Sequence, residues 1–269
     1  MKRILVVLVV IALLVFGLTA CSRQPNTGSA KESHLDKVIR LKAIRIAVLP
    51  DNPGWSVMKA DGSFEGFDID IAKDLAKLLG AKIEFVSTDG PNRITLAQAN
   101  KVDVVIAGFT AVNERAKLIN FTDPYAAAGS LALYKKSNPI SSWDNLKNKR
   151  IAVARGSTAD IMVTNDYPNA KISRFDTIAD VMLALKTDKV DALIEDDSQV
   201  FNFAKNNPEM EALAGEPRNL AYSAMGLQKG DQEWLNFLNH YIRNLNYSGK
   251  TNELYKKWFG RDMPKLYPF

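Results

Sequence analysis

Strand and helix signals alternate along almost the whole chain. Apolar runs such as Ile44–Leu49 and Arg150–Ala154 are typical of buried strands. The apolar spacing in Ile69–Leu79 is typical of an amphipathic helix, which Gly80 would end. A regular alternation of this kind predicts an α/β fold, in which helices pack against a sheet.

One short segment occurs twice in similar form. Lys101–Ile106 reads KVDVVI, and Lys189–Ile194 reads KVDALI. Each copy follows a helical stretch and ends in a polar segment, which is Gly108–Thr110 in the first case and Glu195–Ser198 in the second. Ligands of open α/β sheets bind outside the carboxyl ends of the strands. We therefore predict two lobes that face one cleft.

Chain length and net charge restrict the number of domains and the kinds of partner. About 235 residues follow His34, which suits one large domain or two of moderate size. The net charge is +5, from 35 Lys and Arg against 30 Asp and Glu. These basic residues are scattered and form no stripe of the kind that nucleic acid requires, so we expect no nucleic acid partner.

Most of the usual catalytic inventory is missing. The two histidines, His34 and His240, lie far apart in the sequence, and no His-x-Glu or Cys-x-x-Cys pattern occurs. There is also no phosphate-binding Gly-rich loop and no Gly-x-Ser-x-Gly elbow. We expect no metal, no cofactor and no nucleophile mechanism.

The polar residues after the predicted strands suit a zwitterion. Arg115 offers a planar guanidinium that can hold a carboxylate, with help from Thr110 and the backbone near Gly108. Gly156–Thr158 precedes a predicted helix, whose free N–H groups would add an anion site. Asp196 could accept an ammonium group. Together these are the groups that an α-amino acid needs.

A purely structural role is the alternative for the same residues. Arg115 could pair with Glu114 or Asp123 at the surface, and Asp196 could cap a helix. Residue types alone leave this open.

The first 21 residues combine the features of an export signal. Met1–Arg3 is charged, an apolar run follows from Ile4 to about Leu18, and Leu18–Cys21 reads LTAC. This pattern resembles the lipobox of bacterial lipoprotein signal peptides. The resemblance implies that residues 1–20 are removed and that Cys21, the only cysteine, carries lipid such as palmitate. Residues 21–34 would then be a flexible tether.

Two other interpretations of this N-terminus are less favourable. An uncleaved anchor is disfavoured because the apolar run is shorter than the ~20 residues that span a bilayer. A plain secretory signal would leave a lone thiol in an oxidising compartment.

Two longer segments resemble the hallmarks of the family 3 solute-binding proteins, which serve polar amino acid ABC importers. They are Gly66–Ala72 (GFDIDIA) and Asn113–Tyr125 (NERAKLINFTDPY). The similarity continues through residues 144–147, 190–192 and 255–260. It implies a two-lobed periplasmic-binding-protein fold of type II. Lobe 1 would comprise residues 35–132 plus 224–269, and lobe 2 residues 133–223, with the crossings near 131–134 and 223–226.

The resemblance also implies a binding site. Arg115, Thr110 and the Thr158 amide would hold the α-carboxylate of the ligand. The Gly108 carbonyl and Asp196 would hold the ammonium. The expected side-chain wall consists of Arg93, Phe109, Trp55 and Glu195.

The identity of the amino acid stays open at this stage. Asn92–Ile94 resembles binders of acidic amino acids and cysteine, and residues 109–110 and 156–160 look closest to the cysteine-binding branch. Arg93 favours an acidic or small polar side chain, whereas Glu195 favours a cationic or polar one. The two side chains could instead pair with each other.

These readings converge on a lipid-anchored extracytoplasmic receptor that faces the periplasm or the cell exterior. We expect a monomer that binds a polar α-amino acid between closing lobes and delivers it to the permease subunits of an ABC importer. The alternative is an enzyme similar to cyclohexadienyl or arogenate dehydratases, with Glu195 or Glu114 as the acid. A sensing module would need a transmembrane helix after the binding domain, and we expect none because the chain ends at Phe269.

Overall fold

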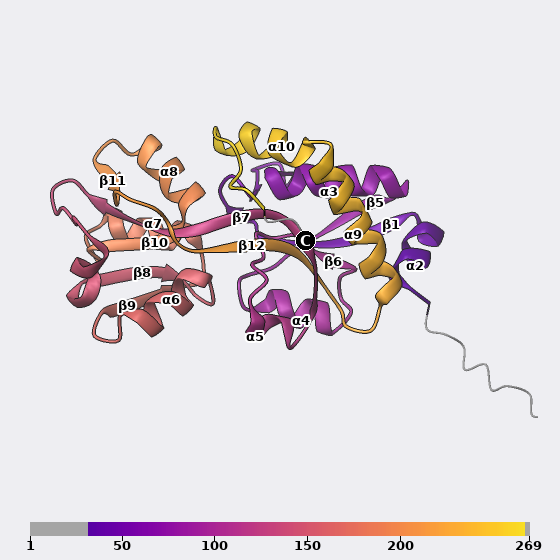
Figure 1. Cartoon of the computed structure of the whole chain (residues 1–269), viewed down its shortest axis with the longest axis horizontal. Helices are drawn as coiled ribbons and strands as arrows, with labels where there is room; N and C mark the ends of the chain where they lie inside the picture. The colour runs from indigo at the N-terminus through magenta and orange to yellow at the C-terminus, as the bar shows by residue number, and fades with distance from the viewer. Residues whose placement is uncertain (1–31, 267–269) are drawn as a thin grey trace, which may run out of the picture. The chain divides into compact units, whose positions relative to one another are not determined.

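The structure is a computed structural model that describes residues 32–266 (Figure 1). The predicted signal peptide at 1–20, the lipidation site Cys21 and all but the end of the predicted tether lie outside the described residues. Residues from Ser33 onward form one compact unit. Within the described part of the chain, no helix is both long and apolar enough to cross a bilayer.

The main sheet confirms the predicted α/β class. Its strands are β1 (Ala43–Val48), β5 (Lys82–Ser87), β6 (Val104–Val105), β7 (Asn120–Lys135), β8 (Arg150–Ala154), β9 (Lys171–Phe175), β10 (Ala192–Asp196), β11 (Met210–Ala212) and β12 (Arg218–Leu227). They are ordered β5-β1-β6-β12-β7-β10-β8-β9, and β11 pairs with β7. A small separate sheet holds β2 (Asp51–Asn52), β3 (Ser56–Met58) and β4 (Phe64–Glu65).

The helices flank these strands as the alternation predicts. They are α2 (His34–Leu41), α3 (Phe67–Leu79), α4 (Asn92–Gln98), α5 (Asn113–Ala116), α6 (Thr158–Asp166), α7 (Ile178–Lys186), α8 (Asp197–Asn206), α9 (Gln232–Tyr247) and α10 (Lys250–Phe259), with a 3-10 helix at Trp143–Asn148. Gly80 ends α3 in the left-handed conformation at φ 61°. Leu78, which the helical spacing places on the inner face, is 62% exposed. It lies in the last turn of α3 and lines a surface groove together with α9.

Buried apolar side chains form separate clusters on either side of a central strand pair. One cluster lies entirely within Leu131–Leu213, and two others draw on residues before Gly129 and after Ala224. In Figure 1 the first group contains β8–β11 and α6–α8, and β7 and β12 run from it to the remaining elements as an antiparallel pair. On this division we keep lobe 1 (35–132 plus 224–269) and lobe 2 (133–223) as a proposal.

The aspartates of the repeated segment make the same contacts in both lobes. Asp103 accepts hydrogen bonds from the backbone N (2.8 Å) and Nη2 (2.7 Å) of Arg45 in β1. Asp191 accepts the same two bonds from Arg150 in β8, at 2.9 and 2.7 Å. In each lobe the aspartate precedes the strand that pairs in parallel with the arginine's strand. The repeat in the sequence therefore reflects a repeated way of joining two strands.

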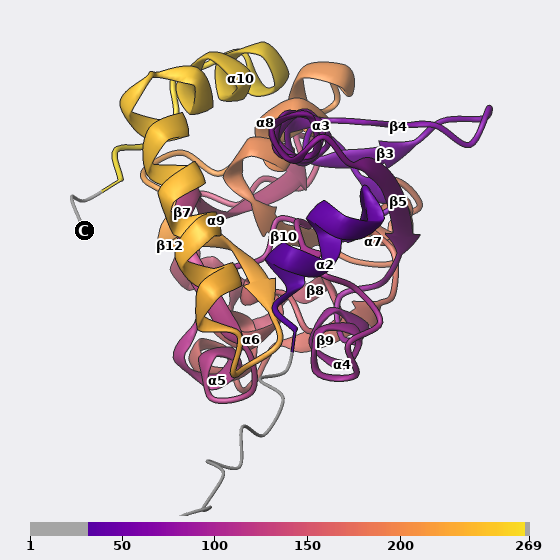
Figure 2. The same cartoon turned by 90° about the vertical axis from the view of Figure 1, so that its right-hand side faces the viewer.

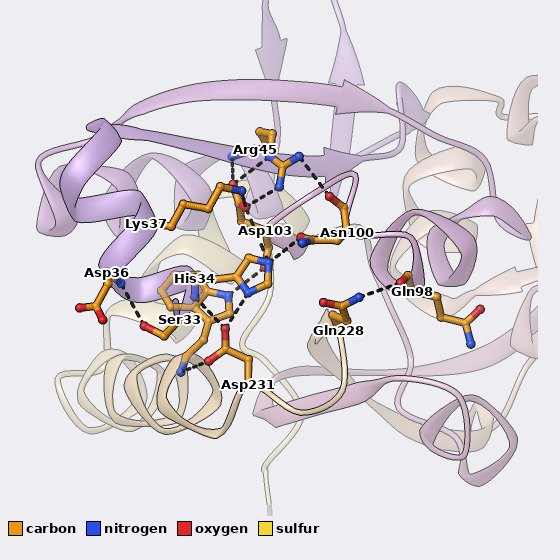
Figure 3. A network of polar contacts seen from close by, with 11 residues as sticks. Ser33, His34, Asp36, Lys37, Arg45, Gln98, Asn100, Asp103, Gln228 and Asp231 are labelled. Carbon is orange, nitrogen blue, oxygen red and sulfur yellow. Dashed lines mark hydrogen bonds and ion pairs between the residues drawn. The ribbon is translucent and has the colours of Figure 1, made fainter. Parts of the chain in front are cut away.

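Helix α2 is held to lobe 1 by a buried histidine (Figure 3). The Nδ1 atom of His34 lies 2.6 Å from Oδ2 of Asp231, and its Nε2 lies 2.7 Å from Oδ1 of Asn100. Asp231 also caps α9 by accepting the N–H of Trp234, so α2 lies beside α9 (Figure 2). The first helix of the described residues thus begins at His34, one residue before Leu35, where we expect folding to start.

Candidate functional site

A cavity of about 60 Å³ lies where residues of the two lobes meet. We call it the interlobe cavity. Seven of the nine predicted binding residues line it: Arg93, Gly108, Thr110 and Arg115 from lobe 1, and Thr158, Glu195 and Asp196 from lobe 2. The structure therefore brings together groups that lie far apart in the sequence, from Arg93 to Asp196.

Trp55 and Phe109 lie behind the cavity wall and are not among its lining residues. Both are fully buried. The Trp55 ring packs against Phe259 at 5.2 Å between centroids, and a Cβ at Gly108 would come within 3.5 Å of this indole. This arrangement differs from the expectation that the two rings cover the ligand. Their large apolar surfaces are buried in lobe 1 and support the wall from behind.

The guanidinium of Arg115 crosses from lobe 1 to lobe 2. The side chain is 7% exposed. Its Nη1 donates to the carbonyl of Thr110 and its Nη2 to the carbonyl of Gly156, both at 2.8 Å. Because a guanidinium has five N–H groups, these two bonds leave donors for a carboxylate. Burial lowers the pKa of Arg115 to about 10, so the group stays charged at neutral pH.

The surface alternative for Arg115 is wrong. Asp123 binds Arg243 instead, with Nε and Oδ2 2.6 Å apart. Glu114 lies exposed on α5, whereas Arg115 on the same short helix is turned inward.

The first turn of α6 faces the cavity from lobe 2. Ser157 is the N-cap, and its hydroxyl accepts the N–H of Asp160 at 3.0 Å. Thr158 is the first helical residue and lines the cavity. The first N–H groups of a helix have no partner within the helix and favour an anion.

Two adjacent carboxyls, Glu195 and Asp196, end β10 and line the same cavity. Burial and the charge of Asp197 raise the pKa of Asp196 to about 7, against the opposing charges of Arg93 and Arg115. Asp196 stands at the N-cap position of α8, as its structural alternative predicts, but its side chain makes no capping hydrogen bond.

Glu195 is 4% exposed, and its Oε1 accepts the N–H of Ala154 at 3.0 Å. Burial and the charge of Asp196 raise its pKa to about 8.

The guanidinium of Arg93 donates hydrogen bonds to backbone carbonyls of its own lobe. Its Nε donates to the carbonyl of Gly90 and its Nη1 to that of Ala107, both at 3.0 Å. The guanidinium also lies over the ring of Phe109, 4.5 Å from the centroid. No ion pair joins it to Glu195 in the described part of the chain, so the alternative in which these two side chains pair with each other is not seen there.

Asp68 supports the site, although the sequence analysis does not predict it to be a functional residue. It is fully buried on α3. Its Oδ1 accepts the hydroxyl of Tyr125 at 2.8 Å, and its Oδ2 accepts the N–H of Gly108 at 2.6 Å. The two hallmark segments therefore meet through this carboxyl. A carboxylate inside an apolar helix pattern was the signal that could have identified it.

The lobes also touch directly through Asp51 and Asn52, two residues shortly after β1 that the sequence analysis does not single out. Oδ2 of Asp51 accepts the N–H of Ile178 at the start of α7, at 2.9 Å. Oδ1 of Asn52 accepts a hydrogen bond from Nε2 of Gln199. Their position after a buried strand, where α/β ligands bind, was the available signal. Among the described residues no His, Cys, Asp and Glu group could hold a metal ion.

Known proteins resemble this chain over most of its length. The model of the bacterial extracellular solute-binding proteins, family 3, matches residues 44–261. The glutamine-binding protein GlnH of an ABC transporter of Bacillus subtilis is 31% identical over 97% of this chain and 99% of its own length.

Two solved structures are also similar. The solute receptor for L-cysteine of Neisseria gonorrhoeae has a TM-score of 0.80 and 34% identity, over 84% of this chain and 93% of that one. The ancestral amino acid-binding protein AncCDT-1, a precursor of cyclohexadienyl dehydratase, has a TM-score of 0.79 and 32% identity, over 85% of this chain and 100% of that one.

Proposed function

Because this chain belongs to the bacterial extracellular solute-binding proteins, family 3, we propose that it is the receptor of an ABC importer and binds an α-amino acid in the interlobe cavity. The type II fold that the sequence predicts is confirmed by the likeness to solved amino acid receptors. The observation that carries the proposal is the placement of Arg115 and Asp196 in one cavity from opposite lobes. Cation and anion then face each other across the space that a zwitterion would fill.

Each end of the ligand has its own partners. The free N–H groups of Arg115, the Thr110 hydroxyl and the Thr158 amide would hold the α-carboxylate. Asp196 and the Gly108 carbonyl would hold the ammonium. Since these groups come from both lobes, binding favours the closed arrangement over an open one. The closed form is what the permease subunits would receive.

The N-terminal features complete the proposal. Cys21 would carry lipid and anchor a monomeric receptor to the cell membrane, where it would face the periplasm or the cell exterior. The segment between Cys21 and His34 would let the binding unit reach the permease.

Thermal denaturation of the full chain in detergent, with each common amino acid in turn, tests this function. A ligand present at about 100 times its Kd should stabilise the folded protein by about 2.7 kcal/mol. A set in which no amino acid raises the melting temperature would refute the proposal.

An enzyme of the dehydratase type is the second candidate. It is favoured by the buried carboxyl of Glu195, whose pKa is raised to about 8, as a general acid requires, and by the likeness to AncCDT-1. Incubation with arogenate or prephenate, followed by an assay for phenylalanine or phenylpyruvate, separates the two functions. Turnover that Glu195→Gln abolishes would establish the enzyme, and recovery of unchanged substrate would favour the receptor.

A further inference from the structure

We propose that Arg261 is a positioning residue for ligand binding, because its ion pair with Asp197 holds the start of α8 in lobe 2 to lobe 1 when the lobes are closed. The inference rests on the proposed function and adds a contact whose two partners do not line the interlobe cavity. It is carried by the lobes from which the two partners come, by the burial of Asp197 and by the position of Asp197 directly after Asp196.

The ion pair joins segments of different lobes. Arg261 follows α10, which packs against α3 and α9 in lobe 1, and Asp197 is the first residue of α8 in lobe 2. Nη2 of Arg261 lies 2.7 Å from Oδ2 of Asp197. Both helices lie on the same side of the strands β7 and β12 (Figure 1). Because each partner moves with its own lobe, opening of the lobes would separate the two charges.

The carboxylate of Asp197 requires a cation in the arrangement seen here. Its side chain is 2% exposed, and a buried carboxylate without a partner is costly. Among the residues that the structure describes, Arg261 is the one cation that pairs with it. Its Oδ1 accepts backbone N–H groups, from Ser198 at 2.8 Å and from Gly129 in β7 at 3.4 Å. The pair therefore suits the closed form, whereas water can solvate both charges once the lobes part.

The guanidinium of Arg261 has a second contact on each side. In lobe 1 its Nη2 donates to the hydroxyl of Tyr255 at 3.4 Å. In lobe 2 it lies over the ring of Phe201, 5.1 Å from the centroid. Asp197 and Phe201 are four residues apart on α8 and therefore share one face of the helix. Arg261 thus bridges the first turn of α8 and the end of α10.

This bridge is adjacent to the proposed ammonium site. Asp196 lines the interlobe cavity and directly precedes Asp197. The side chain of Asp196 makes no capping hydrogen bond at the start of α8, so its direction depends on the backbone that carries it. Holding Asp197 from lobe 1 fixes that backbone. Arg261 would therefore act on the ligand through Asp197 and Asp196, without touching it.

The ion pair and the ligand favour the same arrangement of the lobes. A contact that forms only on closure adds its free energy to that of ligand binding, because both are made in the closed form. The ligand must enter while the lobes are apart. Loss of the contact should therefore speed dissociation and leave the association rate nearly unchanged.

Binding kinetics of the full chain in detergent test the inference. The probes are the common L-amino acids, and stopped-flow tryptophan fluorescence measures both rates for each one that binds the parent. Arg261→Gln should weaken affinity by about tenfold, as expected for a lost hydrogen bond between charged groups, and the loss should appear in the dissociation rate. Arg261→Lys keeps the charge and should recover part of the affinity that the glutamine variant loses.

Arg243→Gln is the matched control, because it removes an ion pair with Asp123 that lies within lobe 1. Both rates should equal those of the parent. Melting temperatures of the ligand-free variants show that they fold. If Arg261→Gln does not fold, Arg261→Lys is compared with Arg243→Lys, and the former should still release the amino acid faster.

The outcomes distinguish this inference from the proposed function. If Arg261→Gln keeps the dissociation rate of the parent, or if Arg243→Gln changes it equally, the inference is overturned and the receptor function stands. An Arg261→Lys variant no better than Arg261→Gln would also overturn it, since the charge would then not matter. If the parent binds no amino acid, both fail.

Discussion

Individual side chains do more than one task at this site. Arg115 links the lobes through the Gly156 carbonyl and keeps N–H groups for a ligand. Asp68 orders the site without lining the interlobe cavity, since it holds Gly108 and Tyr125 from two other segments. The residues that contact a ligand are therefore only part of what the site requires.

Replacing Arg115 by lysine should weaken ligand binding by about tenfold or more. Lysine keeps the charge but loses the planar fork that holds a carboxylate and the Gly156 carbonyl together. Titration calorimetry with the amino acid that gives the largest thermal shift measures the loss. Arg243→Lys, in an exposed ion pair with Asp123, is the control. Equal affinities for the two variants would contradict the assignment.

Asp68→Asn should destabilise the folded protein by about 1–3 kcal/mol, because an amide cannot accept both the Tyr125 hydroxyl and the Gly108 N–H. Denaturant unfolding measures the change in the free energy of unfolding. Asp36→Asn, at an exposed position of α2, should have little effect. A loss confined to ligand affinity, with normal stability, would show that Asp68 contacts the ligand instead.

Helices and strands whose formation depends mainly on their own residues can be predicted from the sequence. The strand Arg150–Ala154 has the predicted bounds, since the apolar run that predicts it is local. The first repeat segment, Lys101–Ile106, is expected to contain a strand, but the strand itself covers only Val104–Val105. Asp103 and Ile106 on either side still donate their N–H groups to the carbonyls of Arg45 and Ala47 in β1, so the length of the strand depends on its neighbour.

The binding site likewise has residues that could be predicted from the sequence and contacts that could not. Arg115 and Asp196 could be predicted because their chemistry is visible in the sequence. The contacts of Asp51 and Asn52 with lobe 2 could not, since they depend on how two distant segments meet. The position of Trp55 behind the wall depends on packing against Phe259, more than 200 residues away.

The repeated aspartates should act locally in their own lobes. Asp103→Asn should loosen the contact between β1 and β6, and Asp191→Asn that between β8 and β10, each by about 1–3 kcal/mol. Hydrogen exchange, read strand by strand, should show faster exchange in lobe 1 for the first variant and in lobe 2 for the second. Each variant is the control for the other. The same exchange pattern in both would argue against two similar, independent junctions.

For the whole molecule, buried carboxyls determine how stability depends on pH. Burial raises the pKa of Asp68 and Asp196 to about 7 and that of Glu195 to about 8. Between their ordinary pKa values and these raised values, the folded state binds protons that the unfolded state has released. Stability of the ligand-free protein contributed by these three groups should therefore fall as pH rises from about 5 to 8.

Thermal denaturation at several pH values between 5 and 8.5 measures this dependence. Asp68→Asn should reduce the slope, because asparagine does not titrate. A melting temperature that rises steadily across this range would contradict the assignment of the buried carboxyls.

The two strands that join the lobes determine how the lobes can move relative to each other. β7 and β12 pair with each other across the junction, so the two connecting strands cannot move independently of each other. Any change in their separation bends and twists one ribbon, which yields most easily at the irregularities between Arg218 and Ala221 and between Ser223 and Ala224. A paired ribbon that bends elastically favours its starting shape, so the lobes can separate again while β7 and β12 stay hydrogen-bonded.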